Sequence, residues 1–427
     1  MFNGFRIWLK ASNFFWLLIR IFSIAIIANE EVMKKLLIVG AGFAGFWGAM
    51  SAVREMKSQG EMDKLSVTLV AKEPFHTIKP RLYEENLEGV QVALKKYCEP
   101  LGIKLVIGEV ISIDPDSNKV SLANIEEPLS YDVLLYAAGS QLNANVLLDN
   151  KNSFNIDTFN NATLLNDHLA LLGTSGFPTE ASKSIVVIGA GFTGLELTTS
   201  LRNRFKESSK QASPIKIHLV DKSEILASNY SGQAQEYIAQ CLSEEDDVEL
   251  HLGDEVKSYE NSSLLLSSGE VIETETVIWT VGVKANKLTD FFNGDVDNIG
   301  RIHVDEFLRL KDYPNVFVAG DVAKAKVDPD NYALMSCQHA MPQGKFAGHN
   351  AVCTLFSGEM KSYAQPKYLT CIDLGGSNAL FTSGWERSVQ MTGSDAKELK
   401  TNITTQWIYP AADVSETLKM SFPELIE

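Results

Sequence analysis

The chain has 427 residues, a length that favours two or three domains, and 45% of them are apolar and 22% charged, as in ordinary globular proteins. A formal net charge of −16 disfavours nucleic acid as a partner, because binding to phosphates needs clustered Lys and Arg. The five cysteines contain no CxxC pair and the seven scattered histidines contain no HExxH, so we expect the reduced thiols of a cytoplasmic protein and no metal site.

Residues 1–32 differ in composition from the rest of the chain. Their segment 14–28 is strongly apolar, but it is too short and too charged for a membrane span, which needs about 20 apolar residues. Three interpretations stay open: translation that begins at Met33, a basic amphipathic helix in peripheral contact with the cytoplasmic face of a membrane, or a secretory signal. The run from Met33 to Val39 is typical of a domain that opens with a buried strand.

An internal duplication organises the chain from residue 36 onward. Four landmarks recur in the same order at offsets between 143 and 150 residues: 36–45 as 185–194, 67–70 as 217–220, 104–108 as 249–253, and 134–139 as 277–282. Two copies at this spacing indicate a duplicated domain rather than a solenoid. Each copy predicts a strand, a glycine turn, a helix (43–56 or 192–205) and a second strand, so the fold class is α/β with two Rossmann-like dinucleotide-binding domains.

The glycine turns carry the prediction of bound dinucleotides. In a Gly-x-Gly-x-x-Gly turn the first glycine allows a tight turn, the second lets a pyrophosphate approach the backbone, and the third lets the helix pack on the sheet. The free N–H groups at the start of the helix then bind the phosphate charge. These residues are Gly40, Gly42 and Gly45 in the first copy and Gly189, Gly191 and Gly194 in the second.

The residue that ends the second strand differs between the copies. In the second copy it is Asp221, whose carboxylate would hold a ribose hydroxyl and repel a 2′-phosphate, so this copy should prefer NADH to NADPH. The first copy has Ala71 there, which weakens the ribose contact and leaves the pyrophosphate site intact. After the second copy the chain continues through 301–305 and 315–321, and we interpret these segments as completing the first domain around an inserted second one.

Together these landmarks resemble the FAD/NAD(P)-dependent pyridine nucleotide-disulfide oxidoreductase superfamily over about residues 33–355. Segment 131–139 is similar to the stretch before that family's central domain, 316–321 to its second FAD motif, and 189–196 to its NADH motif. The resemblance implies FAD as well as NADH as cofactors. It assigns further cofactor-binding roles to Ala138, Gly139, Gly320, Asp321 and Gly282.

The same resemblance implies a division of the chain into domains. An FAD-binding domain would comprise 33–145 and 296–355, with an NADH-binding domain, 146–295, inserted between its two parts. The remaining residues, 356–427, would form a small α+β region with a helix around 394–400. In related reductases this region shapes the acceptor side or the interface of a homodimer.

Two segments, 75–84 and 336–344, are similar to the type II NADH dehydrogenases, which are NADH:quinone oxidoreductases. This resemblance implies hydride transfer from NADH to FAD and electron transfer to a quinone, with Glu196, Gln338 and His339 as catalytic residues. A helix from about 335–339 to 350 would point its positive N-terminus at the flavin. Two other interpretations remain open, a solvated carboxylate for Glu196 and a packed core histidine for His339.

Other acceptors are compatible with the sequence. The disulfide reductases carry a CxxxxC pair that this chain lacks, and a sulfide:quinone reductase would need a partner for Cys337, for which only Cys371 is a candidate. Type II enzymes usually end in membrane-docking helices, whereas segment 411–427 is short and acidic. A reductase of a small iron–sulfur carrier and a non-enzymatic redox-sensing protein are the alternatives to a quinone reductase.

Overall fold

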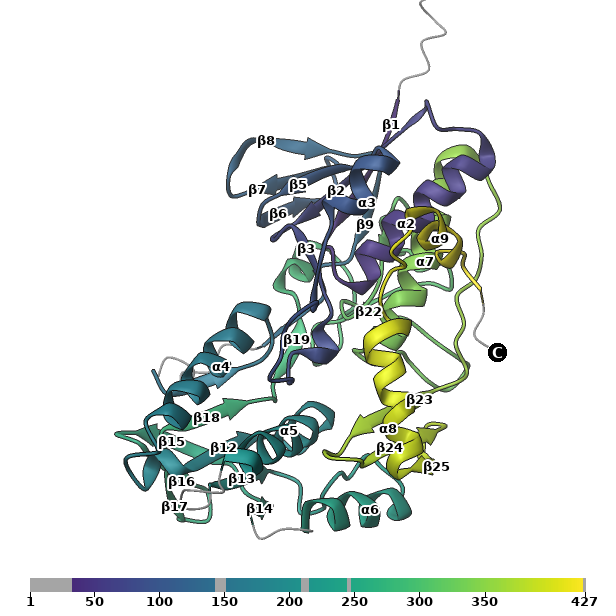
Figure 1. The fold of residues 1–427 in the computed structure, drawn as a ribbon. Coiled ribbons are helices and arrows are strands. Elements are labelled where there is room, and N and C mark those ends of the chain that lie inside the picture. Colours follow the sequence, from purple (N-terminus) through teal and green to yellow (C-terminus); the bar gives the residue numbers. More distant parts are fainter. Residues whose placement is uncertain (1–32, 143–150, 209–214, 244–246, 425–427) are drawn as a thin grey trace, which may run out of the picture.

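The computed structural model describes residues 33–142, 151–208, 215–243 and 247–424. The segment 1–32, with the three interpretations given for it, lies outside these residues. The described chain forms two five-stranded sheets, drawn in the upper and lower halves of Figure 1, and a C-terminal region that runs along one side of both. Within the described ranges, no helix is long and apolar enough to cross a bilayer.

The first sheet is parallel and has the strand order β21-β9-β1-β2-β5. Its strands are β1 (Lys34–Val39), β2 (Leu65–Ala71), β5 (Lys104–Ile107), β9 (Val133–Tyr136) and β21 (Val316–Val318). Alternate residues of β1 point to opposite faces: Leu36 and Ile38 pack with the helices, and Leu37 and Val39 pack with a meander of three antiparallel strands. The helices are α2 (Phe43–Gln59) and α7 (Cys337–Phe356), and the meander is β6 (Val110–Asp114), β7 (Lys119–Leu122) and β8 (Ile125–Ser130).

The second sheet repeats this plan in the order β11-β18-β12-β13-β14. Its strands are β11 (Ser153–Asn155), β12 (Ser184–Ile188), β13 (Lys216–Asp221), β14 (Val248–Leu252) and β18 (Thr276–Trp279). Its helices are α4 (Phe159–Thr174), α5 (Phe192–Ser208) and α6 (Gly232–Ser243), and its meander is β15 (Val256–Glu260), β16 (Ser263–Leu266) and β17 (Val271–Glu273). The repeat confirms the α/β duplication predicted from the sequence.

Short elements connect and close the two halves. The chain leaves the first sheet through β10 (Ser140–Leu142) and returns through β19 (Val283–Ala285), and these two strands pair antiparallel. The others are β3 (Phe75–Thr77), β4 (Gln91–Ala93), α3 (Lys95–Cys98), β20 (Ile302–His303) and β22 (Ala323–Lys324). The strand β21, which follows β19 in the chain, then joins the edge of the first sheet.

The C-terminal region contains an antiparallel sheet and two helices. They are β23 (Leu369–Asp373), β24 (Ala379–Ser383), β25 (Ser388–Thr392), α8 (Gly393–Asn402) and α9 (Val414–Met420), with a π-helical turn at Ile403–Trp407. Figure 1 shows α8 in yellow beside β23–β25, the sheet that contacts α5 and α6 of the second half, whereas α9 lies on α2 of the first half. This region therefore contacts both halves of the duplication.

Two helices of the first half touch almost backbone to backbone. A Cβ atom at Gly344 of α7 would lie 2.1 Å from the carbonyl oxygen of Ala44, and one at Gly348 would lie 2.1 Å from that of Gly48. Side chains larger than a hydrogen atom would separate α7 from α2, because packed interiors leave no room for an added methyl group. The close approach fixes the start of α7 beside the turn that precedes α2.

Candidate active site

The first glycine turn connects β1 to α2. Gly40 has a φ of +102°, and a Cβ atom there would lie 2.2 Å from the carbonyl oxygen of Ala137, so the strand can turn only with glycine. A Cβ at Gly45 would lie 1.8 Å from the Gly40 carbonyl oxygen. A Cβ at Gly42, in contrast, would meet no atom within 4 Å. The open side of the turn is therefore at the second glycine, where a dinucleotide cradle needs space for a pyrophosphate.

The second glycine turn, between β12 and α5, has the same division of roles. Gly189 has a φ of +109°, and a Cβ atom there would lie 2.2 Å from Val281 Cγ1. A Cβ at Gly194 would lie 1.7 Å from the Gly189 carbonyl oxygen, and one at Gly191 would meet nothing within 4 Å. Gly139 and Gly282, the matching residues beyond β9 and β18, also border open space. Both turns fit the diphosphate of a dinucleotide.

A side chain holds the same backbone position in each turn. In the first, the buried His76 donates from Nδ1 to the carbonyl oxygen of Ala41 at 3.0 Å and stacks on Phe46 at 4.9 Å. In the second, Asp221 Oδ2 accepts a hydrogen bond from the N–H of Ala190 at 2.7 Å. Burial lowers the pKa of His76 to about 4, so this imidazole is neutral at pH 7. Asp221 ends β13, where the predicted ribose contact requires an acid.

After the second half, the chain returns through β21 and places Gly320 and Asp321 near the first glycine turn, Gly40–Gly45. We call this turn, with the residues around it, the first cradle, and the turn Gly189–Gly194 the second. The N–H of Gly320 donates to Gln343 Oε1 of α7 at 2.7 Å, and Ser140 Oγ donates to Asp321 Oδ2 at 2.6 Å. Burial raises the pKa of Asp321, although Ser140 opposes the shift. Ala138 lies between β9 and β10, on the same side of the sheet end. These contacts bring the residues predicted for FAD to the carboxyl edge of the first sheet, where α/β sheets bind their ligands.

Glu196 is buried, so its interpretation as a solvated carboxylate was wrong. It lies one turn into α5 with 2% of its surface exposed, and its Oε1 is 2.7 Å from Nζ of Lys400 on α8. The same oxygen accepts the N–H of Asp373 at 3.0 Å. Burial raises the pKa of Glu196 to about 7, because the loss of hydration outweighs the attraction of Lys400. A carboxyl group that titrates near neutrality can take up and release protons.

Lys400 and its neighbours join three parts of the molecule. Burial lowers the pKa of Lys400, but Glu196, together with Cys371 and Asp373, raises it by more in total, so the net shift is upward. On the other side, Asp373 of β23 forms an ion pair with Lys397 and accepts a hydrogen bond from the hydroxyl of Tyr83 at 3.3 Å. Tyr83 comes from the first half, Glu196 from the second, and the rest from the C-terminal region. The pair is thus formed only in the complete fold.

A polar pocket of about 320 Å³ opens beside this cluster. It is lined by Tyr83, Glu84, Glu85, Ser200, Asn203, Asp373, Lys397, Lys400, Thr401, Thr404 and Thr405. Pockets that bind organic ligands are lined mostly by apolar side chains, whereas the side chains around this pocket are polar or charged. The pocket therefore suits water and ions better than the aromatic ring of a ligand. We therefore interpret the pocket as a connection between the buried pair and solvent.

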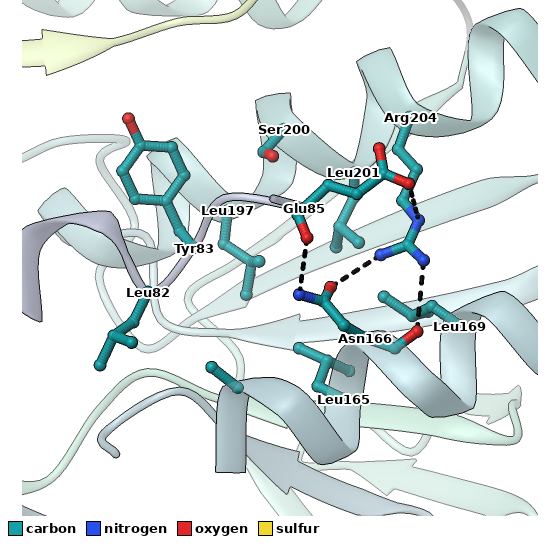
Figure 2. A pocket seen from close by; sticks show the side chains of 11 residues that line it. Leu82, Tyr83, Glu85, Leu165, Asn166, Leu169, Leu197, Ser200, Leu201 and Arg204 are labelled. Carbon is teal, nitrogen blue, oxygen red and sulfur yellow. Dashed lines mark hydrogen bonds and ion pairs between the residues drawn. The ribbon is translucent and has the colours of Figure 1, made fainter. Parts of the chain in front are cut away.

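A smaller cavity next to it is filled by contacts between the two halves (Figure 2). Arg204 of α5 lies 3.2 Å from the carboxylate of Glu85 and donates to Oδ1 of Asn166 at 2.8 Å. Asn166 of α4 in turn donates to the backbone oxygen of Glu85 at 3.1 Å. The space left is about 10 Å³, close to the minimum for one water molecule. The residues around this cavity hold the two halves together and leave no room for a substrate.

The start of α7 carries Gln338 and His339. The amide of Gln338 exchanges two hydrogen bonds with the backbone of Leu369, of 2.7 and 3.1 Å, and so ties α7 to β23. His339 is 1% exposed, accepts the N–H of Leu334 at Nδ1, and stacks on Tyr368 at 5.7 Å. Burial lowers the pKa of His339 to about 4. These contacts favour a structural role for both residues, and their predicted role toward the acceptor stays a prediction.

All five cysteines are free thiols. Burial raises the pKa of Cys337 to about 11 and that of Cys371 to about 12, so both are protonated at neutral pH. Because the thiolate is the reactive form, neither residue is prepared to act as a nucleophile toward a sulfur substrate. The structure gives no support to the thiol-based alternative.

The sequence analysis missed Lys400, Asp373 and His76 as site residues. His76 lies in segment 75–84, which was noted only for its resemblance to a flavin-side loop. Lys400 lies in a predicted helix where most of the residues are charged or polar, so nothing local marks it as buried. Its partner is 204 positions away in the chain, as their residue numbers show, and only the tertiary structure brings them together.

Residues 34–344 match the pyridine nucleotide-disulphide oxidoreductase family. The chain belongs to this family. It is 35% identical to an NADH dehydrogenase-like protein of Mycobacterium tuberculosis, over 88% of this chain and 95% of that protein. It is 24% identical to a type II NADH:quinone oxidoreductase of Staphylococcus epidermidis, over 90% and 98% of the two chains. Its fold is similar to that of the sulfide:quinone oxidoreductase of Aquifex aeolicus, with a TM-score of 0.72, 17% identity, and coverage of 91% and 92%.

Membership of the family and the two cradles identify this oxidoreductase as NADH dehydrogenase-like, with FAD and NADH as cofactors. The resemblance to this superfamily, stated from the sequence, is confirmed. The likeness to the sulfide:quinone oxidoreductase, at 17% identity, shows the fold alone.

Proposed function

We propose that this oxidoreductase passes electrons from NADH through FAD to a quinone. The observation that carries the proposal is the buried pair of Glu196 and Lys400, placed one turn beyond the glycine turn for NADH. Reduction of a quinone to a quinol takes up two electrons and two protons. The hydride of NADH accounts for both electrons and one proton, and the second proton comes from the medium. An iron–sulfur carrier takes up single electrons and no proton, and would not need a buried acid with a pKa near 7.

The residues of this chain would bind and orient NADH and FAD, and they would supply a proton. The turn at Gly189–Gly194 and the carboxylate of Asp221 would hold the diphosphate and ribose of NADH. The turn at Gly40–Gly45, with Asp321, would hold FAD, which supplies hydride acceptance and electron transfer when it is bound. Hydride transfer needs close approach and alignment of the two rings more than it needs acid–base groups, so the part of these residues in that step would be to bind and orient the cofactors.

The proton is held between Glu196 Oε1 and Lys400 Nζ, which are 2.7 Å apart. Lys400 also lines the polar pocket, so the pair can be reprotonated from solvent through water there. When the quinone is reduced, the pair releases one proton and then regains it from the pocket. We assign Glu196 as the proton-relaying residue and Lys400 as the group that positions it.

Contact with a membrane follows from a quinone acceptor, because natural quinones are lipids. We therefore propose a cytoplasmic protein that meets its acceptor at the membrane surface. The segment that would provide the contact in the sequence analysis, 1–32, lies outside the described residues. A homodimer through the C-terminal region also stays a prediction.

The test is a stopped-flow experiment on the purified, flavin-loaded protein. NADH should bleach the flavin absorbance rapidly, and a soluble quinone analogue should restore it at a rate comparable to turnover. In the variant Glu196→Gln, bleaching should stay fast while the return of absorbance slows. Bleaching without return in the wild-type protein, or return with an iron–sulfur carrier alone, would reject the quinone as acceptor.

A further inference from the structure

Two histidines that are 33 residues apart in the chain meet on the second sheet. The register of β13 and β14 pairs His218 with Glu249 and Val220 with His251, so all four side chains lie on one face of the sheet. The meander β15–β17 covers this face, because Val220 packs with Tyr259 and Leu264. The two histidines are thus distant in the sequence but adjacent in the fold, which the expectation of no metal site, based on sequence spacing alone, did not take into account.

The nitrogens of the two rings face each other. Nδ1 of His218 lies 3.0 Å from Nε2 of His251, and Oε2 of Glu249 lies 3.9 Å from the same Nδ1. All three ligand atoms lie within 4.8 Å of one another. In a tetrahedral zinc site with bonds of about 2.0–2.1 Å, neighbouring ligand atoms are about 3.3 Å apart. The two measured separations lie on either side of that value, so one ion could bind all three atoms once the Glu249 side chain, which is 45% exposed, turns toward the two rings.

The outer contacts have the form that metal-binding histidines use. Nδ1 of His251 lies 3.3 Å from Oε2 of Glu270, in the turn between β16 and β17. A carboxylate that accepts this N–H fixes the tautomer in which Nε2 is free to bind a metal. Burial lowers the pKa of His218 to about 4, so its ring is neutral, the form that coordinates metals.

We propose that this cluster binds one zinc-class divalent ion through His218 Nδ1, His251 Nε2 and the carboxylate of Glu249, with water as a fourth ligand. The ion would connect the edge strand β14 to β13 directly and to the meander through Glu270. Asp221, which holds the second glycine turn, ends β13 three residues after His218. The bound ion therefore stiffens the strand that carries the ribose-binding carboxylate.

The His218, Glu249 and His251 cluster suits a metal ion better than the second group of candidate ligands does. Lys216 Nζ lies 3.5 Å from Oε2 of Glu249, but both side chains are 45% exposed, so the ammonium group can move into water when the ion binds. A second group, Glu55, His349 and Cys353, is less suitable. There the guanidinium of Arg54 lies 3.0 Å from the Glu55 carboxylate, and the Nε2 of His349 already faces the carbonyl oxygen of Glu359 at 3.1 Å.

The test uses the full-length, untagged holoprotein after treatment with a chelator. Titration with Zn²⁺ against a competing chromophoric chelator should give one ion per chain. Binding should weaken at least tenfold in H218Q and in H251Q, and by roughly 10–100-fold in E270Q, which loses only the outer contact. The matched control is H303Q, because His303 is exposed on the short strand β20 and should leave the affinity unchanged. Flavin absorbance and circular dichroism verify that each variant folds.

X-ray absorption at the zinc edge identifies the ligands. Nitrogen and oxygen neighbours at about 2.0–2.1 Å, with the multiple scattering of two imidazoles, are expected. A sulfur neighbour at about 2.3 Å would place the ion at Cys353 instead and overturn the proposal. The absence of Zn²⁺ uptake by the wild-type chain, or equal uptake by H218Q and H251Q, would overturn it as well. None of these results depends on the electron acceptor.

Discussion

The two glycine turns share a backbone and differ in the side chains that support them. The equivalent alanines, Ala41 and Ala190, are held through a carbonyl oxygen by a buried neutral imidazole in the first turn and through an N–H by a half-buried carboxylate in the second. At the next helical turn the first copy has Trp47 and the second has Glu196, and each lies against a lysine. The duplication has therefore kept the geometry that any dinucleotide needs.

What has changed is the chemistry around that geometry. Lys345 lies 4.9 Å from the ring centre of Trp47, an apolar and uncharged partner, in the first half. Lys400 lies 2.7 Å from a titratable acid in the second. A cofactor that stays bound needs packing, whereas a substrate that enters, reacts and leaves benefits from charged groups that select it and exchange protons. The contrast fits FAD in the first cradle and NADH in the second.

Lys400→Met should have the largest effect, because it removes the only ionic partner that the structure gives to Glu196 among the described residues. Leaving a buried charge unpaired costs about 3–5 kcal/mol in the free energy of unfolding, unless the acid becomes protonated. Chemical denaturation at pH 8 measures this loss. Lys345→Met, whose partner is an aromatic ring, should cost about 1 kcal/mol, in line with a cation–π contact. Equal losses in the two variants would show that the ion pair of Lys400 stabilises the fold no more than the cation–π contact of Lys345 does.

Glu196→Gln should lower the turnover number with a quinone by about 10²-fold, the smaller end of what general acid–base groups contribute. Because burial raises the pKa of Glu196 to about 7, the protonated form dominates below that value. Wild-type turnover should fall as the pH rises through about 7, and the variant should show a flatter profile. Stability follows the same sign: the contribution of the protonated acid is complete below its usual pKa of 4.5 and is lost as the pH rises through about 7. A profile that is the same in both proteins would contradict this assignment.

Gly45→Ala and Gly194→Ala separate the two turns. Each added Cβ would lie less than 2 Å from a backbone oxygen, 1.8 and 1.7 Å respectively, and should cost about 1–3 kcal/mol. The first variant should lose flavin absorbance, and the second should stay yellow but lose affinity for NADH. The controls are Gly42→Ala and Gly191→Ala, which meet no atom within 4 Å and should weaken cofactor binding without a loss of stability. If Gly194→Ala released flavin as readily as Gly45→Ala, the turns would not be independent.

Asp221→Asn should raise the KM for NADH by about tenfold, because a hydrogen bond to a charged group contributes about 1.5–3 kcal/mol. The discrimination against NADPH should fall at the same time, since the repulsion of a 2′-phosphate is removed. Steady-state kinetics with both nucleotides measure these changes. Flavin content is the internal control and should not change, because the first cradle has Ala71 at this position.

Glu85→Gln should have the smallest effect. Its carboxylate pairs with Arg204 across the two halves but is 61% exposed, and exposed ion pairs contribute about 0.2–1 kcal/mol. Arg204→Met should cost more, because Arg204 also donates to the side chain and backbone of Asn166. Thermal unfolding of the two single variants and the double variant gives the coupling. A coupling well above 1 kcal/mol would mean that the halves are held together more tightly than their cradles require.

Local sequence patterns were sufficient for the parts that depend on neighbouring residues. The two turns follow from glycines within six positions, and α2 and α5 were predicted near their observed bounds because each follows a glycine turn. Even the direction of Asp221 follows from its place at the end of a strand. These features could be predicted since the forces that produce them act over short distances in the chain.

The rest depends on contacts between distant segments. The burial of Glu196 requires α8, and the position of His76 requires the turn at Ala41. The pairing of His218 with His251 depends on the register of β13 and β14, which a single sequence does not specify. The role of Gln338 toward the acceptor was expected from the resemblance of segment 336–344 and stays a prediction, but the contact of its amide with the backbone of Leu369 on β23 could not be predicted from the sequence.

The place of Lys400 in the chain has a consequence for how this protein can be recombined. The stretch that matches the family ends at residue 344, yet the counter-ion of Glu196 comes from α8, beyond it. A chimera that joins residues 34–344 to the tail of another reductase would bury Glu196 without Lys400, unless the new tail places a base at the same position. The second half and the C-terminal region should therefore be exchanged together, because a substitution at Glu196 or Lys400 changes the environment of the other residue.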